Sequence, residues 1–322
     1  MAKVTSSAVS VILPILNEEN YLEAAVHAVL AQNYSGPIEV VLAVAPSKDR
    51  TLEIAKKLAD ADSRIKVVLN PSGRTAAGLN LAIQNSSHPI IVRVDGHAKI
   101  SENYISIAVE LLENTGAVNV GGVMAAEGEN SFERAVAGAM RSSLGVGAAK
   151  FHTGGGAGEA HTVYLGVFKR SAIEAIGGFD EHFTRAQDWE LNYRLRKNGG
   201  KIYFDPRLMV TYRPRRSLIA LAKQYFEYGR WRRVVSRTHK GTINLRYLAP
   251  PFTLIGTLIS LISGFLNPTL FIPAAIYGIF LVLASLKIGK TSIERLYLPA
   301  ILLTMHMSWG LGFITSTRRF VR

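Results

Sequence analysis

The chain has 322 residues, of which 48% are hydrophobic, and a formal net charge of +13. It contains no cysteine, which excludes disulfides and cysteine-ligated metal sites. The mean hydropathy of +0.17 requires strongly apolar segments, because the first two-thirds of the chain carries ordinary charge. The basic charge indicates an anionic partner, either nucleic acid or a membrane surface.

The first hundred residues alternate short apolar runs with amphipathic helical patterns. Strands are predicted at 9–16, 38–44, 65–69 and 90–94. Helical patterns follow the first three of these strands, at 21–30, 51–58 and 75–84. This alternation predicts βαβ units and a parallel sheet. The segment contains neither a G-x-G-x-x-G motif nor a P-loop.

The fourth predicted strand ends at a carboxylate. In open α/β sheets, ligands bind beyond the carboxyl ends of the strands, so Asp95 is predicted to face a crevice. His97 lies two residues later, on the same side of an extended segment, and could be a second metal ligand. A carboxylate with an imidazole suits Mn²⁺ and, less well, Mg²⁺. Taken alone, the dipeptide Asp95-Gly96 is more typical of a simple turn.

The pattern is weaker between residues 100 and 183. Helices are predicted at 103–113, 132–143 and 172–176, and strands at 117–124 and 163–168. The glycine-rich stretch at 145–158 is either a flexible loop or a loop that covers an acceptor site, and the sequence favours neither.

A helix ended by two glycines is predicted at 184–199. Asp188 shares one face of this helix with leucines three and seven residues later. It lies near the helix N-terminus, where the helix dipole favours an ionised carboxylate. Asp188 is therefore either a capping acid or a functional carboxylate. Glu190 and Arg194 have i, i+4 spacing and are interpreted as a surface ion pair.

The C-terminal third is first basic and then apolar. Ten Lys or Arg residues and one acid lie within 211–246, directly before the apolar region, which favours a membrane surface over nucleic acid. No charged residue occurs from Tyr247 to Leu286, and Asn267-Pro268 divides this run into two segments near the ~20 residues needed to cross a bilayer. We predict a catalytic domain at 1–210, a basic interfacial segment at 211–246, and a transmembrane region at 247–322 with apolar segments at 248–266, 269–286 and 296–317.

The third apolar segment creates a conflict of topology. Three full spans would place the arginine-rich tail at 318–322 outside, whereas basic residues near spans tend to stay in the cytoplasm. Either this tail is an exception to that tendency or one segment is re-entrant.

Five short motifs together resemble a family 2 glycosyltransferase with the GT-A fold, in particular the membrane-attached bacterial ExoA-type subgroup of succinoglycan biosynthesis. In chain order, the motifs are 14–18, 70–80, 95–97, 187–188 and 224–231. The motifs lie within roughly residues 9–231, and the resemblance also extends to the apolar tail. The sequence departs from the family pattern at His97, which replaces the second acid of D-x-D, and at Gln187, which replaces a glutamate.

The resemblance implies an inverting, metal-dependent enzyme of cell-surface polysaccharide synthesis. It would move a sugar from a nucleotide-sugar donor to a hydroxyl of a lipid-linked or polysaccharide acceptor. Asp188 would be the catalytic base, and Asp95 and His97 would hold Mn²⁺ or Mg²⁺. The donor-binding residues would be Pro14, Asn17, Glu18, Asp49, Arg74 and Asp95. The acceptor-side residues would be Gln224, Arg230 and Trp231.

The resemblance also implies a multi-pass protein of the cell membrane with its catalytic domain in the cytoplasm. Membrane lipid would be a partner and nucleic acid would not. Two alternatives stay open. One is a polyprenyl-phosphate glycosyltransferase, and the other is a non-catalytic membrane scaffold with a degenerate GT-A domain.

Overall fold

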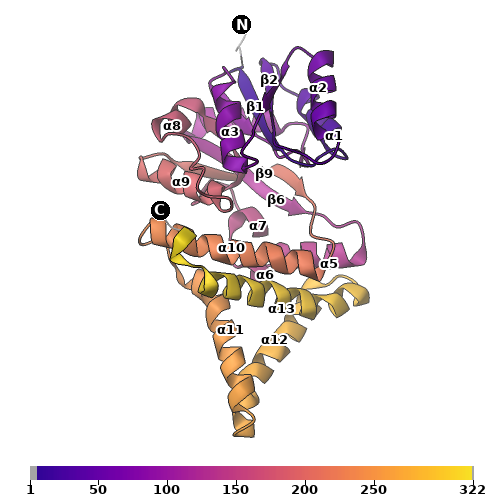
Figure 1. The fold of residues 1–322 in the computed structure, drawn as a ribbon, viewed down its shortest axis with the longest axis vertical. Helices are drawn as coiled ribbons and strands as arrows, with labels where there is room; N and C mark the ends of the chain where they lie inside the picture. Colours follow the sequence, from indigo (N-terminus) through magenta and orange to yellow (C-terminus); the bar gives the residue numbers. More distant parts are fainter. Residues whose placement is uncertain (1–5, 321–322) are drawn as a thin grey trace. The chain divides into compact units, whose positions relative to one another are not determined.

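The computed structural model describes residues 6–320, which divide into two compact units (Figure 1). The first unit comprises the chain up to Ala125 together with Gly154–Tyr212. The second comprises Ala126–Thr153 and the chain from Arg213 onward. The predicted boundaries place all of 1–210 in one domain. The structure instead groups Ala126–Thr153 with the C-terminal helices, because the buried apolar face of its helix packs against them.

The first unit is built on one mixed sheet. Within the described residues, the strand order is β3-β2-β1-β4-β8-β6-β9-β5, with β7 paired to β9. The strands are β1 Val9–Ile15, β2 Ile38–Val44, β3 Ile65–Leu69, β4 Ile90–Arg93, β5 Lys99–Ile100, β6 Asn119–Ala126, β7 Gly158–Glu159, β8 Tyr164–Lys169 and β9 Ile202–Tyr212.

The prediction of a parallel sheet is correct for only part of the molecule. The β1–β2, β1–β4 and β2–β3 pairs are parallel, whereas the β4–β8, β6–β8, β5–β9 and β7–β9 pairs are antiparallel. Helical crossovers, which parallel strands require, join only the first four strands in regular alternation. The sequence does not predict β9, because Asp205, Pro206 and Arg207 interrupt its apolar pattern.

Helices cover the parallel strands with their apolar faces. The helices α1 Leu22–Leu30, α2 Thr51–Ala61 and α4 Tyr104–Thr115 share one buried cluster with Val11, Leu13 and Ile15 of β1. The buried residues of α3 Thr75–Gln84 lie outside that cluster, and α3 packs against β1 and β2. Each fully buried aliphatic side chain contributes about 1.5–3 kcal/mol. This packing holds the strands in place, and polar side chains lie in the loops that follow them.

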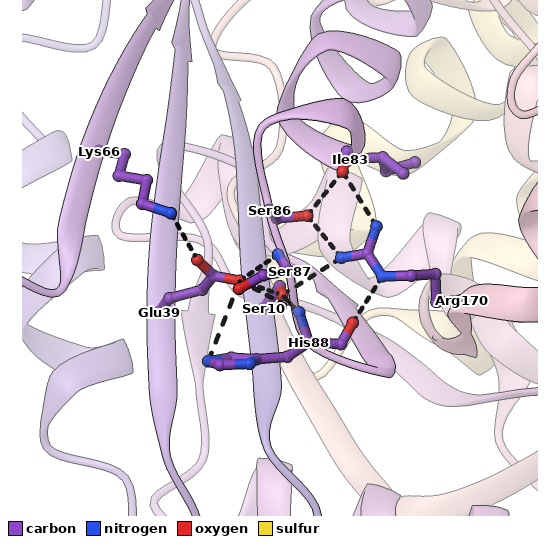
Figure 2. A network of polar contacts seen from close by, with 8 residues as sticks. All are labelled: Ser10, Glu39, Lys66, Ile83, Ser86, Ser87, His88 and Arg170. Atoms are coloured by element: carbon purple, nitrogen blue, oxygen red, sulfur yellow. Dashed lines mark hydrogen bonds and ion pairs between the residues drawn. The ribbon is translucent and has the colours of Figure 1, made fainter.

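A buried carboxylate joins the first three strands to the segment before β4 (Figure 2). Glu39 Oε1 accepts hydrogen bonds from Ser10 Oγ at 2.7 Å and from Ser87 N–H at 2.6 Å, and Lys66 Nζ lies 3.0 Å from Oε2. Arg170 extends the network by donating to the His88 carbonyl at 2.6 Å. Burial raises the pKa of Glu39, but these donors outweigh it and lower the pKa to about 2.

We expect Glu39→Gln to lower the free energy of unfolding at pH 7 by about 1–3 kcal/mol, because a charged acceptor is lost from a buried network. The folded-state pKa of Glu39 lies below its ordinary value of 4.5. Its contribution is therefore complete above that value and is lost as the pH falls toward about 2.

Thermal unfolding of wild type and variant between pH 7 and pH 3 measures this effect, and the gap between them should narrow below pH 4.5. Glu53→Gln, on the exposed side of α2, is the control. Equal melting temperatures for wild type and Glu39→Gln at pH 7 would contradict the assignment.

The second unit consists of helices. A long basic helix, α10 Leu218–Thr238, packs along α13 Ser292–Thr315. Two glycines make this contact possible: a Cβ on Gly229 would clash with the Trp309 carbonyl, and one on Gly312 with the Phe226 carbonyl. The remaining helices are α5 Ser131–Met140, α6 Ser143–Val146, α7 Lys150–Thr153, α11 Leu245–Ser263 and α12 Ile272–Ile288.

Among the residues that the structure describes, three helical segments are long and apolar enough to cross a membrane. They are Leu245–Ser263, Pro268–Ile288 and Ser292–Thr315, and they coincide with the three predicted apolar segments apart from their ends. The first two form a hairpin, in which residues 264–267 make the turn and the second segment begins with the 3-10 helix Pro268–Phe271 (Figure 1). The glycine-rich stretch at 145–158 is not one open loop, since it contains the end of α6, all of α7 and the start of β7.

Candidate active site

The loops that follow β1 and β2 are tied together in the first unit. Ser47 Oγ accepts a hydrogen bond from Asn17 N–H at 3.0 Å, and Asn17 Oδ1 accepts one from Lys48 N–H at 2.8 Å. Asn17 has a φ of 56°, in the left-handed region that asparagine tolerates better than most residues. Pro14 lies within β1, in register with Ala43 of β2. The predicted donor-binding motif thus lies at the carboxyl end of β1, tied to the loop that follows β2.

Asp49 positions the beginning of α2. Its carboxylate accepts hydrogen bonds from Thr51 N–H at 3.1 Å, Thr51 Oγ1 at 2.5 Å and Glu19 N–H at 3.2 Å. Desolvation raises the pKa of Asp49, but these bonds outweigh it and lower the pKa below its ordinary value. Asp49 therefore holds the two loops in place as an anion, and its contact with a donor stays a prediction.

The loop after β4 approaches the loop after β1 closely at Gly96. A Cβ at this position would lie 2.5 Å from Ile15 Cγ2 and 3.0 Å from Glu18 Cγ, so a side chain would push the two loops apart. The approach brings His97 Nδ1 to 2.7 Å from Glu18 Oε1. Glu18, predicted as a donor-binding residue, thus holds the imidazole of the predicted metal ligand.

A buried arginine joins the two carboxylates that the sequence singles out. Arg93 is the last residue of β4, and its side chain is 4% exposed. Its Nη2 donates to Asp95 Oδ1 at 3.1 Å, and its Nη1 donates to Asp188 Oδ1. Asp188 lies in the first turn of α9 Gln187–Lys197. The ends of β4 and α9 are therefore held together by one guanidinium between two acids.

The charge balance of Asp188 differs from the predicted one. Burial raises the pKa of Asp188, the Arg93 guanidinium lowers it, and Asp95 raises it further, with a net upward shift. The predicted support for the anion is the helix dipole, whereas the structure adds a direct ion pair. Ala186, just before the helix, has a φ of 61°, a conformation that costs a non-glycine residue about 1–3 kcal/mol.

Arg74 lies at the N-terminus of α3 and is exposed. Its Nη1 donates to the Glu181 carbonyl at 3.4 Å. Asn80 of the same helix donates to the Phe179 carbonyl at 2.9 Å and accepts from Phe179 N–H at 2.8 Å. The α3 helix and the segment before α9 are thus linked, which places Arg74 beside the chain leading to Asp188. Its role toward a diphosphate stays a prediction.

The predicted acceptor-side residues lie on α10, in the second unit. Gln224 Nε2 donates to the Tyr228 hydroxyl at 2.7 Å, and Arg230 Nη1 donates to Glu227 Oε1 at 2.8 Å. Trp231 is 5% exposed, and its ring centroid lies 6.0 Å from that of Phe320. The indole is therefore a packed side chain of its own unit. The assignment of these three residues to an acceptor stays a prediction.

Sequence reasoning misses Arg93 and misjudges one ion pair. A single arginine inside the apolar run Ile90–Val94 is the signal that could have drawn attention to Arg93.

The Glu190–Arg194 pair is confirmed, with Nε–Oε1 and Nη2–Oε2 distances of 2.7 Å each. It is not a surface pair, however, because Glu190 is buried and Arg194 also donates to the Ile176 carbonyl.

The residues at the carboxyl ends of these strands suit a metal ion whose remaining ligands would be substrate phosphates. Among residues 6–320, no three His, Cys, Asp or Glu side chains gather into a metal site. Ions of the Mg²⁺ type are usually held by one or two carboxylates together with substrate phosphates, so the predicted pair of Asp95 and His97 would be enough protein ligands for such an ion. Because Glu18 engages His97 Nδ1, a metal would take Nε2, the arrangement in which a carboxylate orients a ligating imidazole.

Comparison with known proteins identifies the family. The model described as glycosyl transferase family 2 matches residues 10–177. The chain belongs to this family. It is also 30% identical over 320 residues to the succinoglycan biosynthesis protein ExoA of Rhizobium meliloti, a match that covers 97% of this chain and 95% of ExoA. This glycosyltransferase chain is therefore similar to ExoA over nearly its whole length.

Further relatives agree with this family. A dolichyl N-acetyl-α-D-glucosaminyl phosphate 3-β-D-2,3-diacetamido-2,3-dideoxy-β-D-glucuronosyltransferase of Methanococcus voltae is 26% identical, with 95% of each chain covered. The mannosyltransferase PcManGT of Pyrobaculum calidifontis, solved with GDP-Man and Mn²⁺, has a TM-score of 0.60 at 18% identity, covering 97% of this chain and 87% of PcManGT. These likenesses confirm the predicted GT-A fold.

We expect Arg93→Met to destabilise the first unit by about 3–5 kcal/mol, because two half-buried carboxylates lose the buried cation between them. The matched control is Arg64→Met, which removes an exposed pair with Asp62 and should cost about 0–1 kcal/mol. Chemical or thermal unfolding of both variants measures the difference. Equal stability of the two variants would show that Arg93 does not hold the carboxylates together.

Proposed function

We propose that this glycosyltransferase moves a sugar, with inversion, from a nucleotide-sugar donor to a hydroxyl group of a lipid-linked or polysaccharide acceptor. The reaction would occur at the cytoplasmic face of the cell membrane, in cell-surface polysaccharide synthesis. The observation that carries the proposal is the bridge from Asp95 through Arg93 to Asp188. Direct displacement needs a charge-neutralising group beside the leaving diphosphate and a base beside the attacking hydroxyl, held close together.

Asp188 is proposed as the general base. As an anion, its carboxylate would take the proton of the acceptor hydroxyl while that oxygen attacks the anomeric carbon of the donor. The bond from this carbon to the diphosphate oxygen would break at the same time, and the configuration would invert. The Arg93 ion pair supports this role, because it favours the ionised form that a base must have.

Asp95 and His97 are proposed as ligands for Mn²⁺ or Mg²⁺. When bound there, such an ion would neutralise charge on the leaving diphosphate. Pro14, Asn17 and the loop held by Asp49 would border the nucleoside. Glu18 would orient the His97 imidazole, and Arg74 would add positive charge from the N-terminus of α3. PcManGT, of the same fold, supports a divalent ion, since it was solved with Mn²⁺.

The acceptor class is inferred from relatives and from the membrane helices. The name of ExoA places that relative in succinoglycan biosynthesis, and the name of the Methanococcus voltae relative gives a dolichyl N-acetylglucosaminyl phosphate. Three helices apolar enough for a membrane support a lipid-linked acceptor presented at the bilayer surface. Family membership favours an enzyme over a scaffold, and the M. voltae relative favours a sugar hydroxyl over a free lipid phosphate.

We expect Asp188→Asn to reduce sugar transfer on the order of 10²–10⁴-fold while donor affinity is retained, because the amide can bond Arg93 but cannot accept a proton. Donor affinity by calorimetry and turnover should be measured side by side, with Asp60→Asn on the surface of α2 as the control. Wild-type turnover should also fall as the pH drops and Asp188 is protonated, with a midpoint above the ordinary pKa of an aspartate.

Unchanged turnover would reduce Asp188 to a structural acid paired with Arg93. A loss of donor affinity in proportion to turnover would place it in the donor site instead.

We expect Asp95→Ala to abolish metal-dependent transfer. We expect His97→Ala to weaken the apparent Mn²⁺ affinity by at least the about 10–100-fold that loss of a ligand-orienting partner costs, with less effect on saturated turnover. Glu18→Gln should shift the Mn²⁺ dependence in the same direction as His97→Ala, because the imidazole loses the carboxylate that orients it. Titration of Mn²⁺ against turnover and against bound nucleotide separates these effects. Near-normal activity of folded Asp95→Ala would remove this pair as the metal site.

A further inference from the structure

Polar contacts with other helices of the second unit hold the third apolar helix, α13, near its start, its middle and its end. Near its start, Glu294 Oε1 lies 3.4 Å from Arg134 Nε of α5. Near its middle, His306 Nε2 lies 3.0 Å from the Leu144 carbonyl of α6. At its end, Arg237 of α10 donates to the Ser316 carbonyl at 2.8 Å.

These contacts cover a distance comparable to a bilayer. Glu294 and Ser316 are separated by about 33 Å along a helix axis, at 1.5 Å per residue. The hydrocarbon core of a bilayer is about 30 Å thick. If α13 crossed the membrane, its partners α5, α6 and α10 would have to cross beside it.

The partner helix α10 is too highly charged for that position. It carries Lys223, Arg230, Arg232, Arg233 and Arg237. The guanidinium of Arg233 lies 4.9 Å from the centroid of the Phe313 ring of α13, and the Gly229 and Gly312 contacts hold the two backbones together. Charged side chains near the centre of a bilayer are strongly unfavourable, so α10 belongs at the surface, and α13 must lie there with it.

The exposed face of α13 fits the same surface. Leu296, Leu303, Leu311 and Ile314 are exposed, and their spacing of seven, eight and three residues places them on one helical face. The opposite face, with Leu298, Ile301, Leu302 and Met305, is buried in the unit. A helix packed on one face and apolar on the other, next to a row of basic residues, suits the boundary between acyl chains and anionic headgroups.

We propose that α13 lies in the plane of the membrane beside α10, with its exposed leucines in contact with lipid. The α11–α12 hairpin is then the part of residues 6–320 that enters the bilayer. Figure 1 shows this hairpin running steeply away from α10 and α13, which lie alongside each other. The tip of the hairpin is apolar, with Phe265 and Leu266 exposed.

This arrangement removes the topological conflict that three spans create. A hairpin returns the chain to the side from which it left, so Arg246 and Lys287, at its two ends, stay on one side of the membrane. With α13 in the plane, Arg318, just after this helix, stays on that side too. All three basic groups then obey the positive-inside tendency.

The absence of cysteine from the natural sequence allows a direct test of sidedness. Full-length single-cysteine variants Lys57→Cys, on exposed α2, and Thr317→Cys, after α13, are treated with a membrane-impermeant maleimide in inside-out and right-side-out vesicles. We expect both cysteines to be labelled in the same vesicle orientation. Labelling of Thr317→Cys only from the side opposite to Lys57→Cys would overturn the proposal.

A depth measurement tests the in-plane position independently. Spin labels on Leu296→Cys, Leu303→Cys and Leu311→Cys should lie at similar depth, by their relative accessibility to oxygen and to a polar nickel complex. Labels on Phe252→Cys, Ile259→Cys and Phe265→Cys of the hairpin should become progressively deeper and serve as the control. A label at Leu303 about 10 Å deeper than those at Leu296 and Leu311 would indicate a span and overturn the proposal.

Discussion

The guanidinium of Arg93 holds two carboxylates that come from distant parts of the chain, and the geometry of the candidate site depends on this one ion pair network. Asp95 follows the same strand, whereas Asp188 begins a helix almost a hundred residues later. Without a cation between them, two acids in a poorly solvated position would repel each other. The arginine therefore allows a metal-ligand candidate and a base candidate to coexist at one strand end, and it is buried because the sheet surrounds it.

Around this centre, the remaining loops are fixed by hydrogen bonds rather than by apolar packing. Asn17 and Ser47 connect the loops after β1 and β2, and Glu18 connects the first loop to His97. Backbone donors would otherwise stay unsatisfied where strands end, so polar side chains from the adjacent loop take that role. The same residues are among those proposed to border the nucleotide. Structural support and substrate binding are thus compatible demands on one set of side chains.

The second unit follows a different physical principle. Its helices are joined by glycine contacts and arginine–aromatic contacts, such as Arg233 of α10 over the Phe313 ring of α13 at 4.9 Å and Arg230 of α10 over the Phe320 ring at 5.3 Å. An arginine over an aromatic ring keeps its charge near water while its stem covers apolar surface. This composition suits a boundary layer between a polar and an apolar medium. Together with the hairpin, it gives the unit one face for lipid and another for its own packing.

The sequence by itself determined the βαβ start, the GT-A family, the carboxylates at the end of β4 and in the 184–199 helix, and the three apolar segments. These features are local, because alternating apolar runs, short motifs and uncharged stretches can be recognised without knowing what they touch. The antiparallel half of the sheet, the transfer of Ala126–Thr153 to the second unit and the burial of Glu190 required tertiary structure.

The bridge through Arg93 and the position of α13 also emerged only in three dimensions. A buried cation is tolerated only beside its partners, and these partners are remote in sequence. A helix of 24 residues has the same length and hydropathy whether it crosses a bilayer or lies along it. Only its neighbours, the charged α10 above all, distinguish the two, because a charge that must stay in water holds any helix packed against it at the surface.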